Sequence, residues 1–422
     1  MHLRPVTFLA SLLGLTLAGT ALADSFPSDI LPQSAGIQLK GGNTSAENLD
    51  QIQALGFKYV RRGFIWPSIE KTPGQYDFSA YDRLVNDAEK RGLSVLGCLA
   101  LNNKAFALVK DPAGREAFAK FAAAAAAHYK GRPVIWELWN EPNNAGMWGK
   151  HGKANSDAFA DEYSEFVKVV APAMRKANPG AIIVAGSVNL YESSFGWMKR
   201  CFDNGVLKAG LDGWSVHPYT TKSPEDHLLY YTRIRKMLAE YGAPAHFALL
   251  NTERGYPIGK AEGYAGGDPA LSREYQSWHF VRQYLCDVLA DVKLSIWYEW
   301  SGNEGFSLKT STEEMPAMLA AKTMFAQLDG YTLARRLDLG SPQDYALVFT
   351  KPGGATKLVV WTSPPSGASP DKIVAHDVTI PVQASGQLAR FDIYGKQDSV
   401  EVIQGKITLH LTGAPLYIIV RP

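Results

Sequence analysis

Eight short apolar runs alternate with longer amphipathic segments between about residues 34 and 330, and this alternation constrains the fold more than any other feature. Apolar runs separated by helical patterns are typical of βα units that build a parallel sheet. Eight such units over about 300 residues match the usual size of a (β/α)8 barrel. We therefore predict an α/β fold, a TIM barrel over residues 24–330. The runs are residues 36–40, 59–64, 94–101, 134–139, 182–187, 213–217, 247–251 and 294–300.

Local signals place helices between these runs. Ser79 and Asp82 form a predicted capping box at a helix start, and residues 272–290 carry a long helical pattern. The alternative is an open doubly wound sheet, which usually has a glycine-rich phosphate turn after its first strand. Gly41-Gly42-Asn43 is not such a turn. The count of eight units favours the closed barrel.

The sequence pattern changes near residue 330. Residues 344–350 and 356–362 flank a Lys-Pro-Gly-Gly turn and predict a β-hairpin. Five further short strands are expected, at residues 378–382, 387–394, 399–403, 406–411 and 416–420. We predict a small β-sandwich over residues 331–422, whose role is either to bind glycan or, as we favour, to brace the barrel.

Residues 1–23 have the pattern of a secretory signal peptide. A short basic start precedes an apolar stretch, and Ala21-Leu22-Ala23 fits a small-x-small cleavage site. The apolar stretch is too short to span a bilayer of about 30 Å. We expect an exported protein, periplasmic or extracellular, that is not stably inserted in a membrane.

Charge and cysteine content exclude several other classes. The chain has 43 Lys and Arg against 41 Asp and Glu, with no block of like charge, so a nucleic-acid partner is not expected. Cys98, Cys201 and Cys286 allow at most one disulfide, and a Cys201–Cys286 bridge stays open. We expect a monomer.

Two glutamates follow predicted strands at places that a barrel brings together. Strand four continues as WELWNEPNN and strand seven as LLNTERGY, which puts Glu141 and Glu253 on the rim where barrels hold active sites. Paired carboxylates suit hydrolysis of a glycosidic bond, one protonating the leaving oxygen and the other attacking the sugar. The protonating group needs a raised pKa, which burial and a nearby negative charge would supply.

Other polar and aromatic residues are expected on the same rim. In strand two, alternation allows Arg61 or Arg62 to point inward and hold a carboxylate ionised. Strand six ends in SVHPY, which contributes His217 and Tyr219. Glu137, deep in strand four, is expected to be structural or to support the arginine.

Together these residues resemble the retaining glycoside hydrolases of clan A. The resemblance rests on Asn-Glu-Pro after strand four, the strand-seven glutamate, the arginine of strand two and the His-x-Tyr of strand six. Within the clan, WxxWNEP, the 112-residue gap between the glutamates and the strand-rich C-terminal tail look most like family 39. The resemblance implies a substrate that is a polysaccharide or oligosaccharide, for instance a bacterial exopolysaccharide of a biofilm.

The resemblance also implies a role for each matching residue. Glu141 matches the general acid/base and Glu253 the nucleophile, with the two carboxyl groups about 5 Å apart rather than the roughly 6.5–9.5 Å of inverting enzymes. The sequence departs from the clan pattern in its doubled arginine and in Glu299. Among the expected substrate contacts, Asn140 holds the sugar 2-hydroxyl and Trp300 supplies a stacking ring. Tyr219 is expected beside the nucleophile, and His217 on the same rim. Arg61 is the expected arginine of the site, with Arg62 as the fallback.

Loop residues Trp66 and Trp148, with Asn102, Asn103 and Tyr256, are further candidates for sugar subsites. The alternative function is a catalytically inactive barrel that only binds carbohydrate. A metal-dependent barrel hydrolase is a second alternative, but the first run, GIQLKG, lacks a His-x-His pair, and the histidines show no ligand cluster. We expect no metal and no cofactor.

Overall fold

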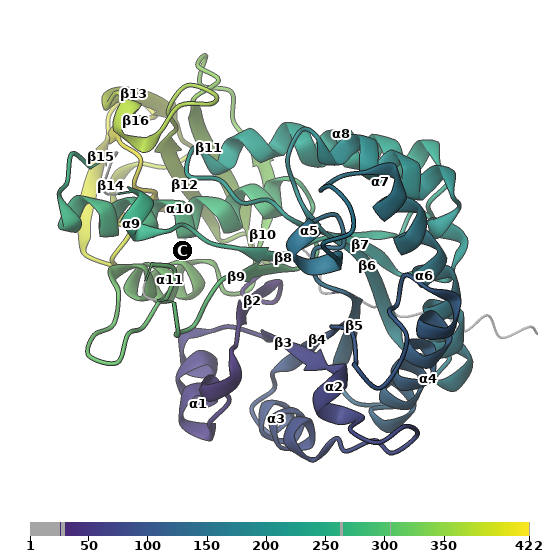
Figure 1. Cartoon of the computed structure of the whole chain (residues 1–422). Helices are drawn as coiled ribbons and strands as arrows, with labels where there is room; N and C mark the ends of the chain where they lie inside the picture. Colours follow the sequence, from purple (N-terminus) through teal and green to yellow (C-terminus); the bar gives the residue numbers. More distant parts are fainter. Residues whose placement is uncertain (1–25, 27–29, 262–264, 304, 422) are drawn as a thin grey trace, which may run out of the picture.

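A computed structural model describes residues 26, 30–261, 265–303 and 305–421. The predicted signal peptide lies outside the described residues. Eight parallel strands close into a barrel, which confirms the predicted TIM barrel (Figure 1). They are β2 (Ala35–Gln38), β3 (Tyr59–Ile65), β4 (Ser94–Ala100), β5 (Val134–Leu138), β6 (Ile182–Asn189), β7 (Gly213–His217), β8 (Ala248–Arg254) and β9 (Ser295–Trp297).

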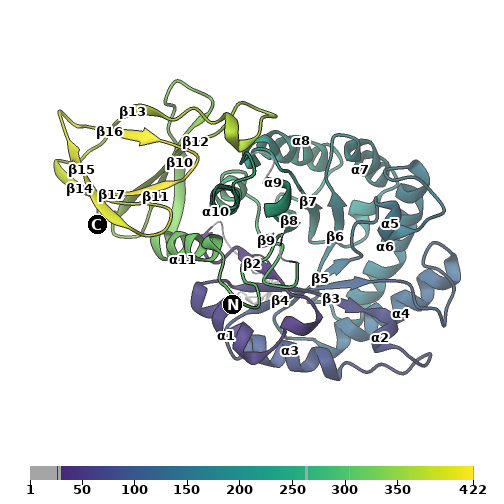
Figure 2. The same ribbon diagram turned by 60° about the vertical axis from the view of Figure 1, so that its left-hand side comes forward.

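Helices surround the barrel and follow the amphipathic segments of the sequence (Figure 2). The long pattern at residues 272–290 lies in α10. The α-helices are α1 (Ala46–Leu55), α2 (Trp66–Ile69), α3 (Ser79–Glu89), α4 (Pro112–His128), α5 (Ala145–Trp148), α6 (Asp157–Ala177), α7 (Ser194–Asp203), α8 (His227–Glu240), α9 (Ile258–Ala261), α10 (Pro269–Leu289) and α11 (Pro316–Leu328). Short 3₁₀ turns are η1 (Gly41–Asn43), η2 (Val206–Lys208), η3 (Pro224–Asp226) and η4 (Pro370–Lys372).

The predicted capping box at Ser79 is wrong. Ser79 is the first residue inside α3, and the Asp77 carboxylate accepts a hydrogen bond from its backbone N–H at 3.0 Å. An acidic side chain two residues earlier therefore satisfies one of the free N–H groups of the first turn.

Two antiparallel sheets follow the barrel. The larger has the order β1-β10-β11-β12-β17-β14-β15, and the smaller pairs β13 with β16. The predicted hairpin is β11 with β12, which pair in register from Asp344 opposite Thr362 to Thr350 opposite Thr356. The strands are β1 (Ile30–Leu31), β10 (Tyr331–Arg336), β11 (Asp344–Thr350), β12 (Thr356–Thr362), β13 (His376–Pro381), β14 (Gly386–Phe391), β15 (Gln397–Val402), β16 (Lys406–Leu411) and β17 (Leu416–Arg421).

Two strands of the larger sheet were not expected from the sequence. β10 comes directly after α11, and β1 precedes the barrel in the chain yet pairs with β10. The β-sandwich class is confirmed, whereas the division of the chain into domains at residue 330 stays a prediction.

The described cysteines Cys98, Cys201 and Cys286 are buried free thiols, so the Cys201–Cys286 bridge does not form. Burial raises the pKa of the Cys98 thiol, which makes it a packing residue rather than a nucleophile. None of the described helices has the length and apolarity that a membrane span requires.

Candidate active site

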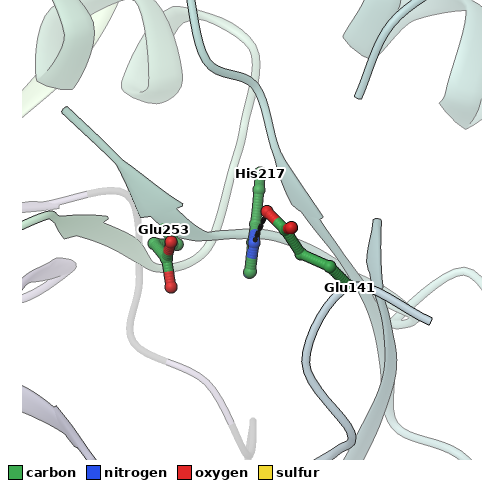
Figure 3. A group of neighbouring side chains, drawn as sticks. All are labelled: Glu141, His217 and Glu253. Atoms are coloured by element: carbon green, nitrogen blue, oxygen red, sulfur yellow. Dashed lines mark hydrogen bonds and ion pairs between the residues drawn. The ribbon is translucent and has the colours of Figure 1, made fainter. Parts of the chain in front are cut away.

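Glu141 and Glu253 face each other across the mouth of the barrel. Glu253 lies in β8, and Glu141 follows β5 in a turn where Trp139 and Glu141 both have positive φ. This unusual backbone directs the Glu141 side chain toward the barrel axis. One oxygen of each carboxylate and one nitrogen of His217 all lie within 4.8 Å of one another (Figure 3).

Arg61 is the arginine of β3 that points into the barrel. Its Nη1 lies 2.5 Å from Oε2 of Glu253, and its Nε lies 2.8 Å from Oε2 of Glu137. Burial alone would lower the pKa of Arg61, but the charges of Glu137 and Glu253 raise it, so the guanidinium stays protonated. Arg62 lies outside this cluster, and its Nη1 is 3.5 Å from the Leu39 carbonyl oxygen.

Glu137 supports Arg61 from below the catalytic level, as expected. The Glu137 carboxylate is fully buried and also accepts a hydrogen bond from Ser215 Oγ at 2.7 Å. Burial would raise the pKa of Glu137, yet Arg61 holds it below its ordinary value. The result is an ionised Glu137 that fixes the guanidinium beneath Glu253.

Glu141 is surrounded by donors. His217 Nδ1 lies 3.2 Å from Oε1, and Asn144 Nδ2 donates to Oε2 at 3.0 Å. Burial would raise the pKa of Glu141, but the hydrogen bond and charge of His217 and the Asn144 bond lower it below 4.5. The expectation of a raised pKa at this carboxyl is therefore wrong, because its donors stabilise the ionised form more than burial destabilises it.

Tyr219 and Asn140 complete the polar cluster. Tyr219 Oη donates to Oε1 of Glu253 at 2.9 Å, so the two oxygens of Glu253 are held by Tyr219 and Arg61. Asn140 Oδ1 accepts from Arg61 Nη2 at 2.7 Å, which leaves the amide NH2 as the end available to a sugar hydroxyl.

The three tryptophans predicted to contact sugar are core residues. Trp66 and Trp300 have no exposed surface and Trp148 is 3% exposed, so none presents a free ring face. Their indole N–H groups donate to Glu70, Asn48 and Glu162, respectively. The prediction that they form sugar platforms is wrong, because their rings are buried, with Phe118 packed against Trp66 and Phe166 against Trp148.

The further loop candidates also have structural roles. Asn103 and Tyr256 are buried, and Asn102 Oδ1 accepts the N–H of Val109 at 2.9 Å. These three described residues stabilise the loops in which they lie, and we assign them no contact with the pit.

Several residues at the site were missed. Gln38 Oε1 accepts from Arg61 at 3.0 Å, Asn189 Nδ2 lies 3.5 Å from Glu141, and Ser187 Oγ lies 3.0 Å from His217 Nε2. Each stands at or near the end of a barrel strand, and the position of polar residues at strand ends was the signal that could have found them.

Tyr298, directly after β9, is a half-buried aromatic residue next to Tyr219, which contacts Glu253. Its ring meets Tyr219 edge-on at 6.4 Å between centroids, and the Lys40 ammonium lies 4.8 Å from its centroid. Lys40 also pairs with the buried Glu299 at 3.2 Å. Of the aromatic residues in the WYEW segment, Tyr298 is the one that keeps exposed surface.

Glu141, His217 and Glu253 supply the atoms that a metal ion would need, but the electrostatics oppose one. A cation between them would approach the Arg61 guanidinium, which lies 2.5 Å from Glu253. The arrangement is suited to a substrate held between the two carboxylates, with one carboxyl group transferring a proton and the other attacking as nucleophile.

Comparisons with known proteins show the family of the chain and its fold. The sequence profile of the family described as cellulase (glycosyl hydrolase family 5) matches residues 23–233. Endo-1,4-beta-xylanase 3 of Hypocrea jecorina is 27% identical over 157 residues, which are 36% of this chain and 44% of the xylanase. This chain therefore aligns with less than half of that relative's length.

Two solved structures share the fold. A family 39 glycoside hydrolase from the gut symbiont Bacteroides cellulosilyticus superposes with a TM-score of 0.75 at 21% identity, covering 94% of this chain and 82% of the other. A family 30 subfamily 8 xylanase from Clostridium acetobutylicum gives 0.61 at 11% identity, covering 94% and 97%. The predicted clan is confirmed, and the likeness to family 39 is one of fold.

Proposed function

The chain belongs to the cellulase family (glycosyl hydrolase family 5) and is an O-glycosyl hydrolase, and from this premise we propose that it cleaves a polysaccharide by double displacement. Glu253 is the proposed nucleophile and Glu141 the proposed acid and base. The observation that carries the proposal is the spacing of the pair, whose oxygens lie within 4.8 Å across the pit. Such a spacing is close to the about 5–5.5 Å between the carboxyl groups of retaining enzymes and shorter than the roughly 6.5–9.5 Å of inverting enzymes.

In the first step, Glu253 attacks the anomeric carbon while Glu141 protonates the departing glycosidic oxygen. In the second, Glu141 takes a proton from water, which attacks the glycosyl-enzyme and releases the sugar with retained configuration. Arg61 and Tyr219 hold Glu253 in line for attack. The lowered pKa of Glu141 suits its role as base in the second step. Because the first step needs protonated Glu141, it also predicts that the rate of this step is highest at acidic pH.

The other site residues take supporting roles in this proposal. Asn140 offers its amide to the sugar 2-hydroxyl, and His217 orients Glu141. His217 is itself held by Ser187, so its ring orientation is fixed before substrate arrives. Tyr298 supplies the aromatic surface at the cleavage site.

The proposed substrate is a polysaccharide such as a bacterial exopolysaccharide of a biofilm matrix. The xylanase and cellulase names of the matched proteins are consistent with a polymer of linked sugars. The signal-peptide pattern at residues 1–23 would bring the enzyme to such a polymer in the periplasm or outside the cell. We propose that it acts as a monomer.

An inactive carbohydrate-binding barrel would keep the pit and lose part of the polar cluster. Here Arg61 and Tyr219 both contact Glu253, and His217 contacts Glu141. New reducing ends after incubation with polysaccharide identify the enzyme, whereas binding without new ends identifies the alternative.

Glu253→Gln tests the assignment of the nucleophile. We expect kcat to fall on the order of 10⁴-fold or more, because the amide cannot form the glycosyl-enzyme, while oligosaccharide affinity is retained. Turnover on an aryl glycoside and calorimetric titration measure the two quantities. Glu401→Gln, an exposed change in β15, is the matched control, and near-full activity in Glu253→Gln would overturn the assignment.

A further inference from the structure

A cavity of about 680 Å³ opens next to the catalytic pair. The barrel contributes the loops after β6, β7 and β8 and the first turn of α8. The second domain contributes Ser366 and Gly367, in the loop between β12 and β13. The Gly367 N–H of that loop donates to Asp226 of η3. The loop lies beside α8 (Figure 2).

The cavity borders the pit that holds Glu141 and Glu253. Tyr219, which donates to Glu253, also lines the cavity. Gly255 of its wall comes two residues after Glu253, and Leu190 comes directly after Asn189, which contacts Glu141. A polymer bound across the catalytic pair would therefore extend into this space.

The cavity presents apolar surface to solvent. Tyr191 is 51% exposed and Leu229 is 72% exposed, although both are large hydrophobic residues. Tyr230, beside Leu229, adds a second ring that packs on Phe195 at 5.3 Å between centroids. Aromatic and aliphatic side chains with a few polar neighbours are typical of sites that hold the apolar face of a sugar ring.

The wall from the second domain is held in place by two consecutive acids of η3. The Asp226 carboxylate accepts the Gly367 N–H at 3.1 Å, which fixes the tip of the loop. Its neighbour Glu225 accepts the indole N–H of Trp361 in β12 at 2.7 Å and is paired with Arg282. The loop is therefore fixed to the barrel at the edge of the cavity.

We propose that this cavity is a subsite for a sugar unit of the polymer beyond the cleaved bond, and that the loop between β12 and β13 is one of its walls. The inference rests on the proposed function and extends it. The second domain then takes part in substrate binding as well as bracing the barrel. Occupation of this subsite gives a long glycan an affinity that a short one lacks.

The test compares a long and a short substrate. In the double variant Tyr191→Ala/Leu229→Ala, we expect KM for a cleaved polysaccharide to rise about ten-fold more than KM for an aryl monosaccharide glycoside, which fills only the cleavage site. Asp226→Ala, which releases the loop between β12 and β13, should also raise KM for the polysaccharide more than KM for the aryl glycoside. Leu319→Ala and Ile403→Ala remove equally exposed apolar side chains elsewhere and serve as matched controls.

The outcomes separate this proposal from the proposed function. Equal changes on both substrates, or no change, would overturn the subsite. An effect of Tyr191→Ala/Leu229→Ala without any effect of Asp226→Ala would overturn the role of the second domain. If the wild-type protein cleaves nothing, the proposed function fails, and calorimetric binding of a long oligosaccharide to the same variants still decides the subsite.

Discussion

Arg61 connects more of the site than any other side chain described. It lies between two carboxylates, Glu137 and Glu253, and also donates to Asn140 and Gln38. The two acids and one cation leave net negative charge in a buried pit, which suits a positively charged sugar transition state. The planar guanidinium can serve these four partners at once, whereas a lysine ammonium has only three donors.

Tyr219→Phe should slow catalysis without displacing the ring. The variant loses the hydroxyl that donates to Glu253 at 2.9 Å. A hydrogen bond to a charged group contributes about 1.5–3 kcal/mol, so we expect kcat/KM to fall about 10–100-fold. Steady-state kinetics on an aryl glycoside check this, with Tyr241→Phe, which loses a surface contact to Asp203, as control. Unchanged kinetics would show that the hydroxyl does not position Glu253.

His217→Phe should move the pH profile. The pKa of Glu141 is lowered by His217 against the opposing effect of burial, so removing the histidine raises it. The acid step needs protonated Glu141, and kcat/KM falls as pH rises through that pKa. The descending limb of kcat/KM against pH should therefore shift to higher pH in the variant.

An oligosaccharide substrate is required for this measurement, because a poor leaving group depends on protonation. Asn189→Ala is the comparison, since Asn189 contacts Glu141 at the longer distance of 3.5 Å and should shift the limb less. An unmoved limb in His217→Phe would contradict the electrostatic account of Glu141.

At the level of helices and strands, the sequence predicted those features that depend on the local pattern of apolar and polar residues. All eight barrel strands lie where apolar runs were found, because a buried parallel strand needs a continuous apolar segment. The two glutamates that we propose as catalytic, Glu141 and Glu253, were predicted from their positions at strand ends. Which of Arg61 and Arg62 points inward depends on alternation within β3, and only the pairing of the strands settles it.

Features that depend on distant packing were not predictable. β1 pairs with β10, although about 300 residues separate them, and neither strand has a strong alternating pattern. Trp66 and Trp300 were expected at the pit, but both are buried. Trp66 packs against Phe118 of α4, and Trp300 donates to Asn48 of α1. Exposure of an aromatic ring is a property of the assembled layers, so a loop position alone does not reveal it.

Glu225→Gln should destabilise the junction between η3, α10 and β12. Glu225 and Arg282 are buried, and breaking such a pair by changing one partner costs about 3–5 kcal/mol. Arg282 holds the pKa of Glu225 below 4.5 despite burial, so this contribution is present above about 4.5 and is lost as pH falls through the folded-state pKa. The difference in Tm between wild type and variant should thus be largest near neutral pH and narrow toward pH 3.

Thermal unfolding at several pH values provides this measurement. Glu313→Gln is the matched control, because Glu313 pairs with Arg273 on the surface, where an ion pair contributes about 0–1 kcal/mol. A Tm difference for Glu225→Gln that stays constant from pH 7 to pH 3 would show that the charge of Glu225 is not the source of the stability.

For the whole molecule, the barrel and the larger sheet share one hydrophobic core. Tyr345, Phe349 and Trp361 of that sheet belong to the same buried cluster as the barrel's helices. The opposite face of the sheet, with Val348 and Val360, packs against β13 and β16 in a separate cluster. The sandwich therefore has its own core on one side and completes the barrel's core on the other.

A chain cut to residues 24–330 should not form a stable barrel. The cut removes Tyr345, Phe349 and Trp361 from the shared core. It also removes β10, the partner of β1, and the indole N–H that Trp361 donates to Glu225. Each large side chain lost from a core costs about 3–5 kcal/mol, and the total stability of a typical fold is about 5–15 kcal/mol. We expect aggregation or a loosely packed state, measured by soluble yield, dye binding to exposed apolar surface and the cooperativity of unfolding.

The control is the same cut chain expressed together with residues 331–422 as a separate polypeptide. If the loss comes from the missing half of the core, the two pieces should associate and restore cooperative unfolding, because the buried surface is the same without the covalent link. A cut chain that unfolds cooperatively by itself, with a Tm near that of the full protein, would show that the two cores are energetically independent. The shared core explains why the β12–β13 loop can serve as a cavity wall, since a rigid junction keeps this loop of the sandwich beside the pit of the barrel.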